Sequence, residues 1–258
     1  MPQVSVCTPL YNTEPVQLEE MIESVLSQTF TDFEFLLLND SPDNRRIKEI
    51  VFSYTDKRIR YIENELNIGI SASRNKLIHL SKGSFLAICD HDDISLPERF
   101  EKQVMYLESH SDVGVVSALC SIFGDGNHHF QQHPENSDDI KKMLSHGCYV
   151  AHPASMIRKS VLIDNDIFYK ESYSPAEDYK LWIDLMAVTN FHNIQETLLK
   201  YRTFNGNTSV TQRKKMEKAT KRIQKEVYNR AYHCQNFRVS KIFKSIFLTK
   251  CINFFDKK

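Results

Sequence analysis

The feature that most constrains the fold is a regular alternation between short apolar runs and segments with helical spacing. The run Phe33–Leu38 is almost continuously apolar, as expected for a strand buried on both faces. Strands in such an order predict an α/β, Rossmann-like unit with a mostly parallel central sheet and flanking helices. We expect strands at 4–7, 33–38, 58–62, 85–89, 113–123, 154–157 and 198–201, and helices from 13 or 14 and over 43–55, 71–80, 97–109, 176–188 and 214–232.

Composition excludes several classes of protein. The apolar fraction is 41%, which is enough for a sizeable core and excludes a globally disordered chain. No apolar run approaches the roughly 20 residues that a membrane span needs. The six cysteines are scattered without a CxxC pair, so reduced thiols are expected rather than a disulfide framework or a zinc site. The first residues lack the pattern of a secretory signal, which predicts a cytoplasmic location.

Charge divides the chain into two parts. Residues 1–210 carry 19 Lys/Arg and 30 Asp/Glu, whereas residues 211–258 carry 14 Lys/Arg and 3 Asp/Glu. We therefore predict a globular domain over 1–210 and a basic, amphipathic helical tail over 211–258. A tail with this bias favours an anionic partner surface.

An acidic triplet follows the fourth predicted strand. Asp90, Asp92 and Asp93 lie within four residues, directly after an apolar run. Ligands of parallel sheets collect beyond the carboxyl ends of the strands, and closely spaced carboxylates repel one another unless a cation is present. Mg²⁺ or Mn²⁺ prefers oxygen ligands and leaves positions open for phosphates. The alternative is that one Asp only caps the following helix.

Two further acidic positions lie at element ends. Glu177 and Asp178 begin a predicted helix, where acidic residues complement the helix dipole. Beside a metal-diphosphate site, one of them could instead act as a general base. Asp40 ends the second predicted strand. There it either stabilises a turn or accepts a hydrogen bond from the imide N–H of a nucleobase.

Several segments in fixed order resemble glycosyltransferase family 2. The resemblance covers about residues 3–209, and only the ordered set is specific. It is carried by VSVCTPLYN (4–12), SVLSQTFTDFE (24–34), NIGISASRN (67–75), DHDD (90–93), HPASMIRK (152–159), ED (177–178) and YR (201–202).

The resemblance implies a GT-A fold and an inverting, metal-dependent transfer from a nucleotide-sugar. It implies that Thr8, Tyr11 and Asp40 hold the base, that Asp90 contacts the ribose, that Asp92 ligates Mn²⁺ or Mg²⁺ and that Asp178 is the general base. Arg74 lies in the nucleotide-proximal helix, either as a direct ligand or paired with nearby carboxylates. Glu177, Asp93 and His152 are the remaining candidates for contact with acceptor or diphosphate, although His152 could equally be a satisfied core histidine.

Two positions depart from the family pattern. The family often has two Asp at the end of the second strand, where this chain has Asn39 and Asp40. The family often has His three residues after the Tyr of the YR motif, where this chain has Phe204. That histidine is an additional metal or phosphate contact, so we expect weaker metal binding unless another group replaces it.

The tail contains a second helical pattern with apolar residues from Val239 to Phe255 and lysines largely off that stripe. A Phe-rich, basic amphipathic helix is typical of an interfacial anchor, which predicts a peripheral location on the inner face of the cell membrane. The alternative is that the stripe packs on the catalytic domain or forms a homodimer. No nucleic-acid-binding motif is present.

The expected activity is transfer of a hexose or N-acetylhexosamine from a UDP-sugar to a glycan or lipid-linked acceptor in surface polysaccharide synthesis. A non-catalytic nucleotide-sugar-binding protein on the same fold is the alternative. A nucleotidyltransferase would favour a Gly-rich, basic loop after the first strand, and residues 8–15 contain neither Gly nor Lys/Arg.

Overall fold

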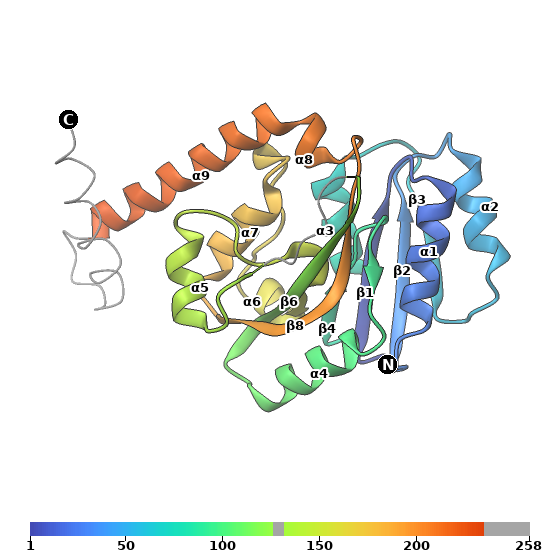
Figure 1. Cartoon of the computed structure of the whole chain (residues 1–258), viewed down its shortest axis with the longest axis horizontal. Helices are drawn as coiled ribbons and strands as arrows, with labels where there is room; N and C mark the ends of the chain where they lie inside the picture. Colours follow the sequence, from blue (N-terminus) through green and yellow to red (C-terminus); the bar gives the residue numbers. More distant parts are fainter. Residues whose placement is uncertain (126–131, 235–258) are drawn as a thin grey trace.

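A computed structural model describes residues 1–125 and 132–234 (Figure 1). The strands are β1 (Val4–Leu10), β2 (Phe33–Asn39), β3 (Ile59–Glu63), β4 (Phe85–Ile88), β5 (Ile94–Ser95), β6 (Val113–Gly124), β7 (Met156–Arg158) and β8 (Asn190–Thr203). The α-helices are α1 (Pro15–Leu26), α2 (Arg45–Ser53), α3 (Ile70–Leu80), α4 (Arg99–Ser109), α5 (Ser137–Leu144), α6 (Lys159–Asp164), α7 (Glu177–Leu185), α8 (Thr208–Thr211) and α9 (Arg213–Cys234). Short 3₁₀ turns lie at His152–Ala154 and Glu171–Tyr173.

The strands form one mixed sheet in the order β3-β2-β1-β4-β7-β6-β8-β5. The pairs β1–β2, β1–β4, β2–β3 and β6–β8 are parallel, as the alternation of strands and helices predicted. Two strands depart from the expected parallel arrangement. β7 runs antiparallel to both β4 and β6, and β5 runs antiparallel to β8. The carboxyl ends of β1, β2 and β4 consequently meet at one edge.

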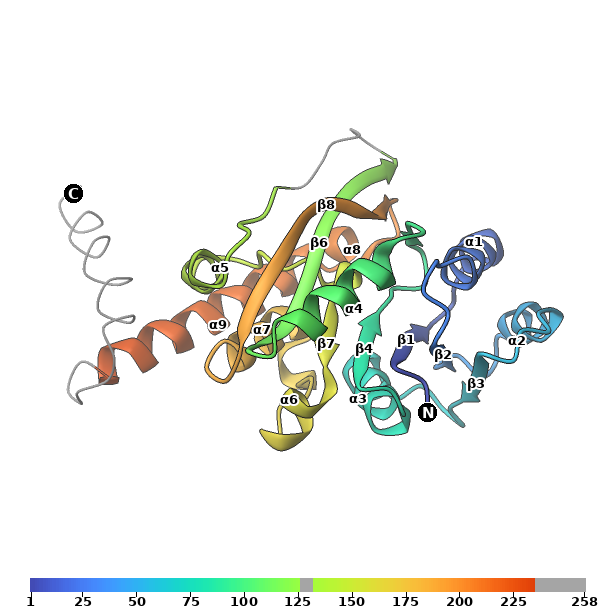
Figure 2. The same ribbon diagram turned by 90° about the horizontal axis from the view of Figure 1, so that it is seen from below.

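Helices cover both faces of this sheet (Figure 2). Alternate side chains of β2 point to opposite faces: Phe35 and Leu37 pack in one buried cluster, and Leu36 and Leu38 in the other. The first cluster draws on α1, α2 and α4, and the second on α3, α5, α6, α7 and α9. Burial on both faces explains why this strand is apolar at almost every position.

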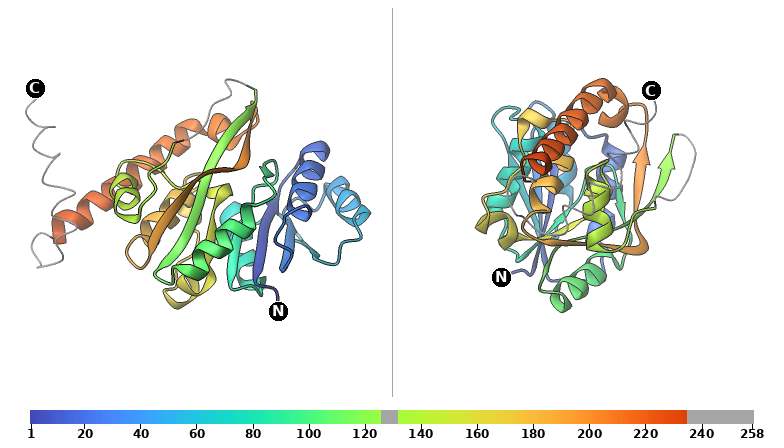
Figure 3. Two further views of the ribbon diagram at one scale, coloured as in Figure 1. Left: turned by 60° about the horizontal axis from the view of Figure 1, so that its bottom comes forward. Right: turned by 90° about the vertical axis from the view of Figure 1, so that its left-hand side faces the viewer.

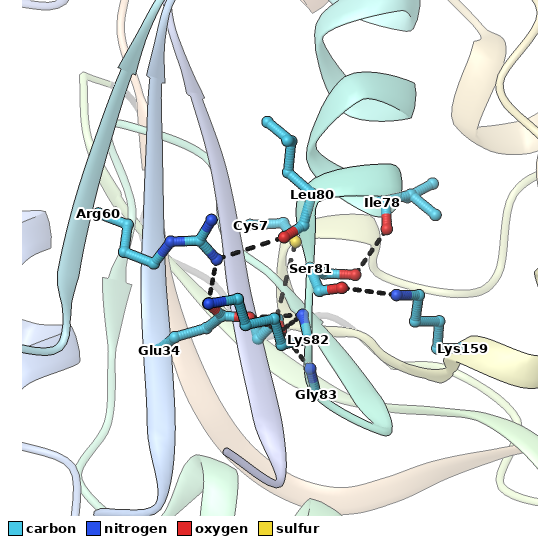
Figure 4. Close-up of polar contacts among 10 residues, drawn as sticks. Cys7, Glu34, Arg60, Ile78, Leu80, Ser81, Lys82, Gly83 and Lys159 are labelled. Atoms are coloured by element: carbon cyan, nitrogen blue, oxygen red, sulfur yellow. Dashed lines mark hydrogen bonds and ion pairs between the residues drawn. The ribbon is translucent and has the colours of Figure 1, made fainter. Parts of the chain in front are cut away.

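A polar network lies at the opposite, amino-terminal end of the sheet (Figure 4). Oε1 of Glu34 accepts hydrogen bonds from Ser5 Oγ at 2.7 Å and from the Lys82 N–H at 2.6 Å. Its other oxygen pairs with Arg60 from β3. Ser5 Oγ also accepts the Gly83 N–H at 2.8 Å, so these contacts join β1, β2 and β3 to the turn before β4. The buried charge of Glu34 near the start of β2 is therefore fully partnered.

The last strand is longer than predicted. β8 begins at Asn190, whereas apolar content alone indicated a strand over 198–201. Its first residues alternate between buried and partly buried side chains and pair with β6 as far as Gly124. This long pairing supplies the backbone hydrogen bonds for a segment that has few apolar residues. The short helices α5, α6 and α8 were also not predicted.

The basic segment after residue 211 begins with a helix, as expected for 214–232. In α9, Ile223 and Val227 are buried in the same cluster as Tyr179 and Trp182 of α7. The first half of the predicted tail therefore packs into the same core as α7, and Figure 3 shows α9 along the outside of the molecule. The apolar pattern from Val239 to Phe255 lies outside the described residues. Within the described ranges, no helix combines the length and apolarity needed to cross a bilayer.

Candidate active site

The predicted site residues gather at the carboxyl-terminal edge of the sheet. Thr8 is fully buried near the end of β1, and its hydroxyl has no hydrogen-bond partner within the described structure. Tyr11 follows in the next loop with 53% of its surface exposed. Asp40 leaves β2 beside it, because β1 and β2 are parallel and in register up to Leu10 and Asn39. These positions lie as the sequence predicted.

Asp40 holds a neighbouring loop in place. Its Oδ1 accepts hydrogen bonds from Asn64 Nδ2 at 2.7 Å and from the Ile68 N–H at 2.9 Å. Its Oδ2 accepts the Gly69 N–H at 3.0 Å, where the backbone has φ +84°, a conformation that side chains disfavour. A carboxylate oxygen can accept two hydrogen bonds, so Oδ2 keeps capacity for a base N–H. The predicted contact with a nucleobase stays a prediction.

The acidic loop after β4 is anchored by Arg202. The Arg202 N–H donates to Asp93 Oδ1 at 2.8 Å, and its Nε donates to the Asp92 carbonyl at 2.7 Å. Its Nη2 forms an ion pair with Glu20 of α1 at 2.5 Å. Arg202 at the end of β8 thus fixes the acidic loop. Asp93 is 2% exposed, and its Oδ2 has no partner within the described residues.

Burial and mutual repulsion destabilise the charged forms of two carboxyls in this loop. Burial raises the pKa of Asp92, and the negative charge of Asp90 raises it further. Burial likewise raises the pKa of Asp93 well above its usual range, with further increases from Asp92 and Asp90. Capping alone would involve one Asp. Closely spaced carboxylates, two of which have destabilised charged forms, are the pattern expected where a cation is to bind.

Arg74 connects this loop to the predicted base. Its Nη2 lies 3.1 Å from Asp90 Oδ1, and its Nη1 lies 2.7 Å from Glu177 Oε1 at the start of α7. Burial alone would raise the pKa of Asp90, but the positive charge of Arg74 holds it below the ordinary value. Of the two roles considered for Arg74, the geometry favours pairing with carboxylates.

Asp178 lies next to this bridge. Burial and then the charge of Glu177 raise its pKa to about 6, against a lowering effect of Arg74. Its Oδ1 accepts the N–H of Tyr179 at 2.6 Å. A carboxylate with a pKa near neutrality is a better proton acceptor than an ordinary Asp. Asp178 can therefore serve as a general base.

His152 is buried, with 5% of its surface exposed. Its Nε2 lies 2.9 Å from the Tyr169 hydroxyl. Burial, followed by the charge of Arg74, lowers its pKa to about 3, so the ring is neutral. This geometry favours the core-histidine alternative over direct contact with acceptor or diphosphate.

Sequence reasoning missed Asn207, which lies beside Asp92. Its Nδ2 donates to Asp92 Oδ2 at 3.5 Å and to the Arg202 carbonyl at 3.3 Å, while its Oδ1 accepts the Phe204 N–H at 2.5 Å. Asn207 thus connects the turn after β8 to the side chain of Asp92. Asn followed by Thr at the start of α8 is a helix-capping signal, and this signal could have drawn attention to it.

Sequence reasoning also missed Tyr169. Its N–H and carbonyl are both bound by the Asn75 amide at 2.9 Å, and its ring lies 5.4 Å from the Arg74 guanidinium. Tyr169 therefore supports both Arg74 and His152. Because Asn75 is 94 positions away in the sequence, no local pattern connects the two.

The carboxylate oxygens of the acidic loop are suitable ligands for a divalent ion that also binds a substrate. Within the described ranges, no three His, Cys, Asp or Glu side chains form a preformed metal cluster. Mg²⁺ and Mn²⁺ are commonly held by one or two carboxylates, with phosphate oxygens and water as further ligands. Asp92 offers such a carboxylate. The partnerless Asp93 Oδ2 lies in the same loop as a second oxygen.

The model of the family "Glycosyl transferase family 2" matches residues 5–165. An uncharacterized glycosyltransferase of Methanocaldococcus jannaschii is 35% identical over 94% of this chain and 85% of its own length. The amylovoran biosynthesis glycosyltransferase AmsE of Erwinia amylovora is 30% identical over 77% of this chain and 75% of its own length.

Solved structures share the fold at low sequence identity. S. aureus TarS 1–349 in complex with UDP-GlcNAc has a TM-score of 0.65 at 22% identity and covers 80% of this chain. This chain spans only 60% of that TarS fragment. The mannosyltransferase PcManGT of Pyrobaculum calidifontis, in complex with GDP-Man and Mn²⁺, has a TM-score of 0.59 at 15% identity, with coverages of 78% and 56%.

Proposed function

Because this chain belongs to glycosyltransferase family 2 and is a glycosyltransferase, we propose that it is an inverting, metal-dependent hexosyl- or N-acetylhexosaminyltransferase that uses a UDP-sugar. One observation carries the proposal. Arg74 joins Asp90 of the acidic loop to Glu177, the neighbour of Asp178. A donor-binding carboxylate and a carboxyl suited to proton abstraction are thereby held in one connected site.

The donor would lie over the carboxyl ends of β1, β2 and β4. Thr8, Tyr11 and Asp40 line the part of this edge proposed for the base, and Asp90 the part proposed for the ribose. The buried, partnerless hydroxyl of Thr8 is consistent with an absent hydrogen-bonding ligand. TarS, which shares the fold, binds UDP-GlcNAc, and this supports a UDP-sugar here.

Asp92 is the proposed side-chain ligand of Mn²⁺ or Mg²⁺. Asp93 Oδ1 accepts the N–H of Arg202, and this contact holds the loop that carries Asp92. A bound divalent ion would neutralise the charge that develops on the leaving diphosphate. The presence of Mn²⁺ with GDP-Man in PcManGT supports this assignment.

Asp178 would take the proton of the acceptor hydroxyl. As that oxygen bonds to the anomeric carbon, the bond from the carbon to the diphosphate oxygen breaks on the opposite face and UDP leaves. This single displacement inverts the configuration, so an α-linked donor gives a β-linkage. A retaining enzyme would need a nucleophilic side chain next to the anomeric carbon. In retaining glycosidases, the second of the two carboxylates is this nucleophile.

The proposed acceptor is a glycan or lipid-linked glycan of a bacterial surface polysaccharide. The amylovoran enzyme AmsE, at 30% identity over most of both chains, supports this substrate class. The membrane association and inner-face location expected from the tail belong to the same proposal. A homodimer through the tail is the alternative.

A panel of nucleotide-sugars with Mn²⁺ tests the function. Calorimetry should show metal-dependent binding of one UDP-sugar, and slow hydrolysis of that donor should be lost in Asp178→Asn with binding retained. Glu65→Gln, in the exposed loop before α3, is a matched control that should leave hydrolysis unchanged. Donor binding without hydrolysis in the parent protein would favour the non-catalytic alternative. Absence of binding to every nucleotide-sugar would contradict the proposed donor.

A further inference from the structure

One face of α9 carries a continuous row of lysines. Lys214, Lys218, Lys221 and Lys225 follow the spacing i, i+4, i+7 and i+11, and all four are exposed. At about 100° per residue they fall within one narrow sector of the helix, on the side opposite to the buried Ile223. The row is about 16 Å long at a rise of ~1.5 Å per residue. We call these four residues the lysine row.

The carboxylates of α9 do not neutralise this row. The helix contains eight Lys/Arg and two Glu. Both glutamates are paired with arginines one turn earlier, Glu217 with Arg213 at 3.1 Å and Glu226 with Arg222 at 3.3 Å. Across the described part of the chain, no ion pair involves a member of the lysine row. Four uncompensated charges therefore face solvent along a line.

The helix that carries the row is fixed to the catalytic domain. Ile223 and Val227 are buried against it, and Gln224 Nε2 donates to the His146 carbonyl at 2.7 Å. Glu226 accepts a hydrogen bond from the Tyr173 hydroxyl at 2.8 Å. Along the chain, Lys214 follows seven residues after Asn207, which contacts Asp92. A surface that binds the row is therefore held in a set orientation to the donor site.

We propose that the lysine row docks the enzyme on the anionic surface of a lipid bilayer. A straight row of flexible ammonium groups suits a planar array of phosphates, and each cation near such a surface adds to binding. The 24 residues that follow α9 in the sequence include five Phe, six Lys/Arg and one acidic residue, a composition that fits the same interface. The inference rests on the proposed function, because it places the site at the surface that would present a lipid-linked acceptor.

The test compares two variants of the full chain with equal change in charge. One replaces all four lysines of the row by Gln. The matched control replaces Lys57, Lys82, Lys142 and Lys200 by Gln, which are exposed lysines scattered outside α9. Co-sedimentation is measured with vesicles of phosphatidylcholine alone and with about 30% phosphatidylglycerol, at low and physiological salt.

The parent and the control should bind phosphatidylglycerol vesicles in a salt-sensitive manner, and the row variant should bind at least about tenfold more weakly. The proposal is overturned if the parent does not bind anionic vesicles or if it binds both lipid compositions equally. It is also overturned if the two variants bind anionic vesicles with the same affinity. Lysine-dependent binding to a single-stranded RNA but not to vesicles also overturns it. Calorimetry on the same preparations, with the UDP-sugar that the donor panel identifies, separates this outcome from failure of the proposed function, because the row variant should bind that donor as the parent does.

Discussion

Nη1 of Arg74 lies 2.7 Å from Oε1 of Glu177, although 103 positions separate the two residues in the sequence. Both side chains are almost fully buried, and the second guanidinium nitrogen pairs with Asp90. The bridge links α3, the loop after β4 and the start of α7. These three elements carry the residues proposed to bind the sugar donor and the residue proposed as general base. The stability and the activity of the site therefore depend on the guanidinium group of Arg74.

We expect Arg74→Ala to lower the free energy of unfolding by about 3–5 kcal/mol, because it leaves Glu177 and Asp90 with uncompensated buried charge. Urea denaturation followed by tryptophan fluorescence measures the loss, since Trp182 is in the core. The control is Arg46→Ala, which breaks the exposed pair with Glu49 and should cost about 0–1 kcal/mol. Equal, small losses in both variants would contradict the structural role of the bridge.

The second prediction concerns the pH dependence of the reaction. Burial and Glu177 raise the pKa of Asp178 to about 6, and a general base works only when it is deprotonated. The rate should therefore rise with pH, with a midpoint near the pKa of about 6 rather than at the ordinary Asp value of 3.8. The measurement is kcat/KM for transfer, or the rate of donor hydrolysis, across this range.

Arg74 provides the check on this assignment. Its positive charge lowers the pKa of Asp178, so a folded Arg74→Gln variant should shift the midpoint of the pH profile upward. Conversely, Glu177→Gln removes a negative charge that raises this pKa, and the midpoint should move downward. A midpoint that is unchanged in both variants would show that a group other than Asp178 controls the rate.

The third prediction concerns the acidic loop and its neighbour Asn207. Asp92→Ala should abolish metal-dependent binding of the UDP-sugar, because it removes the proposed ligand. Asn207→Ala should raise the Mn²⁺ concentration needed for half-maximal binding about 10- to 100-fold, since its amide contacts Asp92 Oδ2. Calorimetric titration of UDP-sugar at several Mn²⁺ concentrations measures both effects.

The adjacent Asn205 is exposed and makes a matched control, because Asn205→Ala should leave the Mn²⁺ requirement unchanged. Asn207 could act by orienting Asp92 or by stabilising the turn in which it binds the Phe204 N–H. Thermal unfolding of Asn207→Ala distinguishes these two roles. If Asn207→Ala lowers the melting temperature but not the apparent affinity for Mn²⁺, Asn207 supports the turn alone.

The sequence predicts the parts of this molecule in which local pattern and tertiary environment agree. The buried strands β1, β2 and β4 are apolar because both faces are covered, and the polar residues after them mark the ligand edge. The first half of β8 was not predictable, because pairing with β6 rather than its own composition makes it a strand.

Within the site, residue types indicated Asp92 and Asp178, but not the contacts that control them. The sequence does not indicate any hydrogen-bond partner for Asp40. In the structure, its carboxylate accepts hydrogen bonds from one side chain and two backbone N–H groups of the loop 64–69. The contacts of Asn207 and Tyr169 join segments far apart in the chain. Such long-range partners follow from the fold and leave no periodic signal.

The last prediction concerns the network at the amino-terminal end of the sheet, where Glu34 is buried among Ser5, Arg60 and the Lys82 N–H. Burial by itself raises the pKa of Glu34, but the hydrogen bonds from Ser5 and Arg60 outweigh this effect and lower it below the ordinary Glu value of 4.5. A carboxyl whose pKa is lower in the folded state stabilises the fold at pH values above its unfolded pKa. That contribution is lost as the pH falls through the lower folded value.

Glu34→Gln should therefore lower the free energy of unfolding by about 1–3 kcal/mol at neutral pH, because Arg60 loses its carboxylate partner. The difference between parent and variant should shrink as the pH falls below about 4, since the parent then also loses the charge. Urea denaturation at a series of pH values measures this difference. The exposed Glu49→Gln serves as the control and should change stability little at any pH. A deficit of Glu34→Gln that stays constant down to acidic pH would show that the loss comes from packing and not from the charge of Glu34.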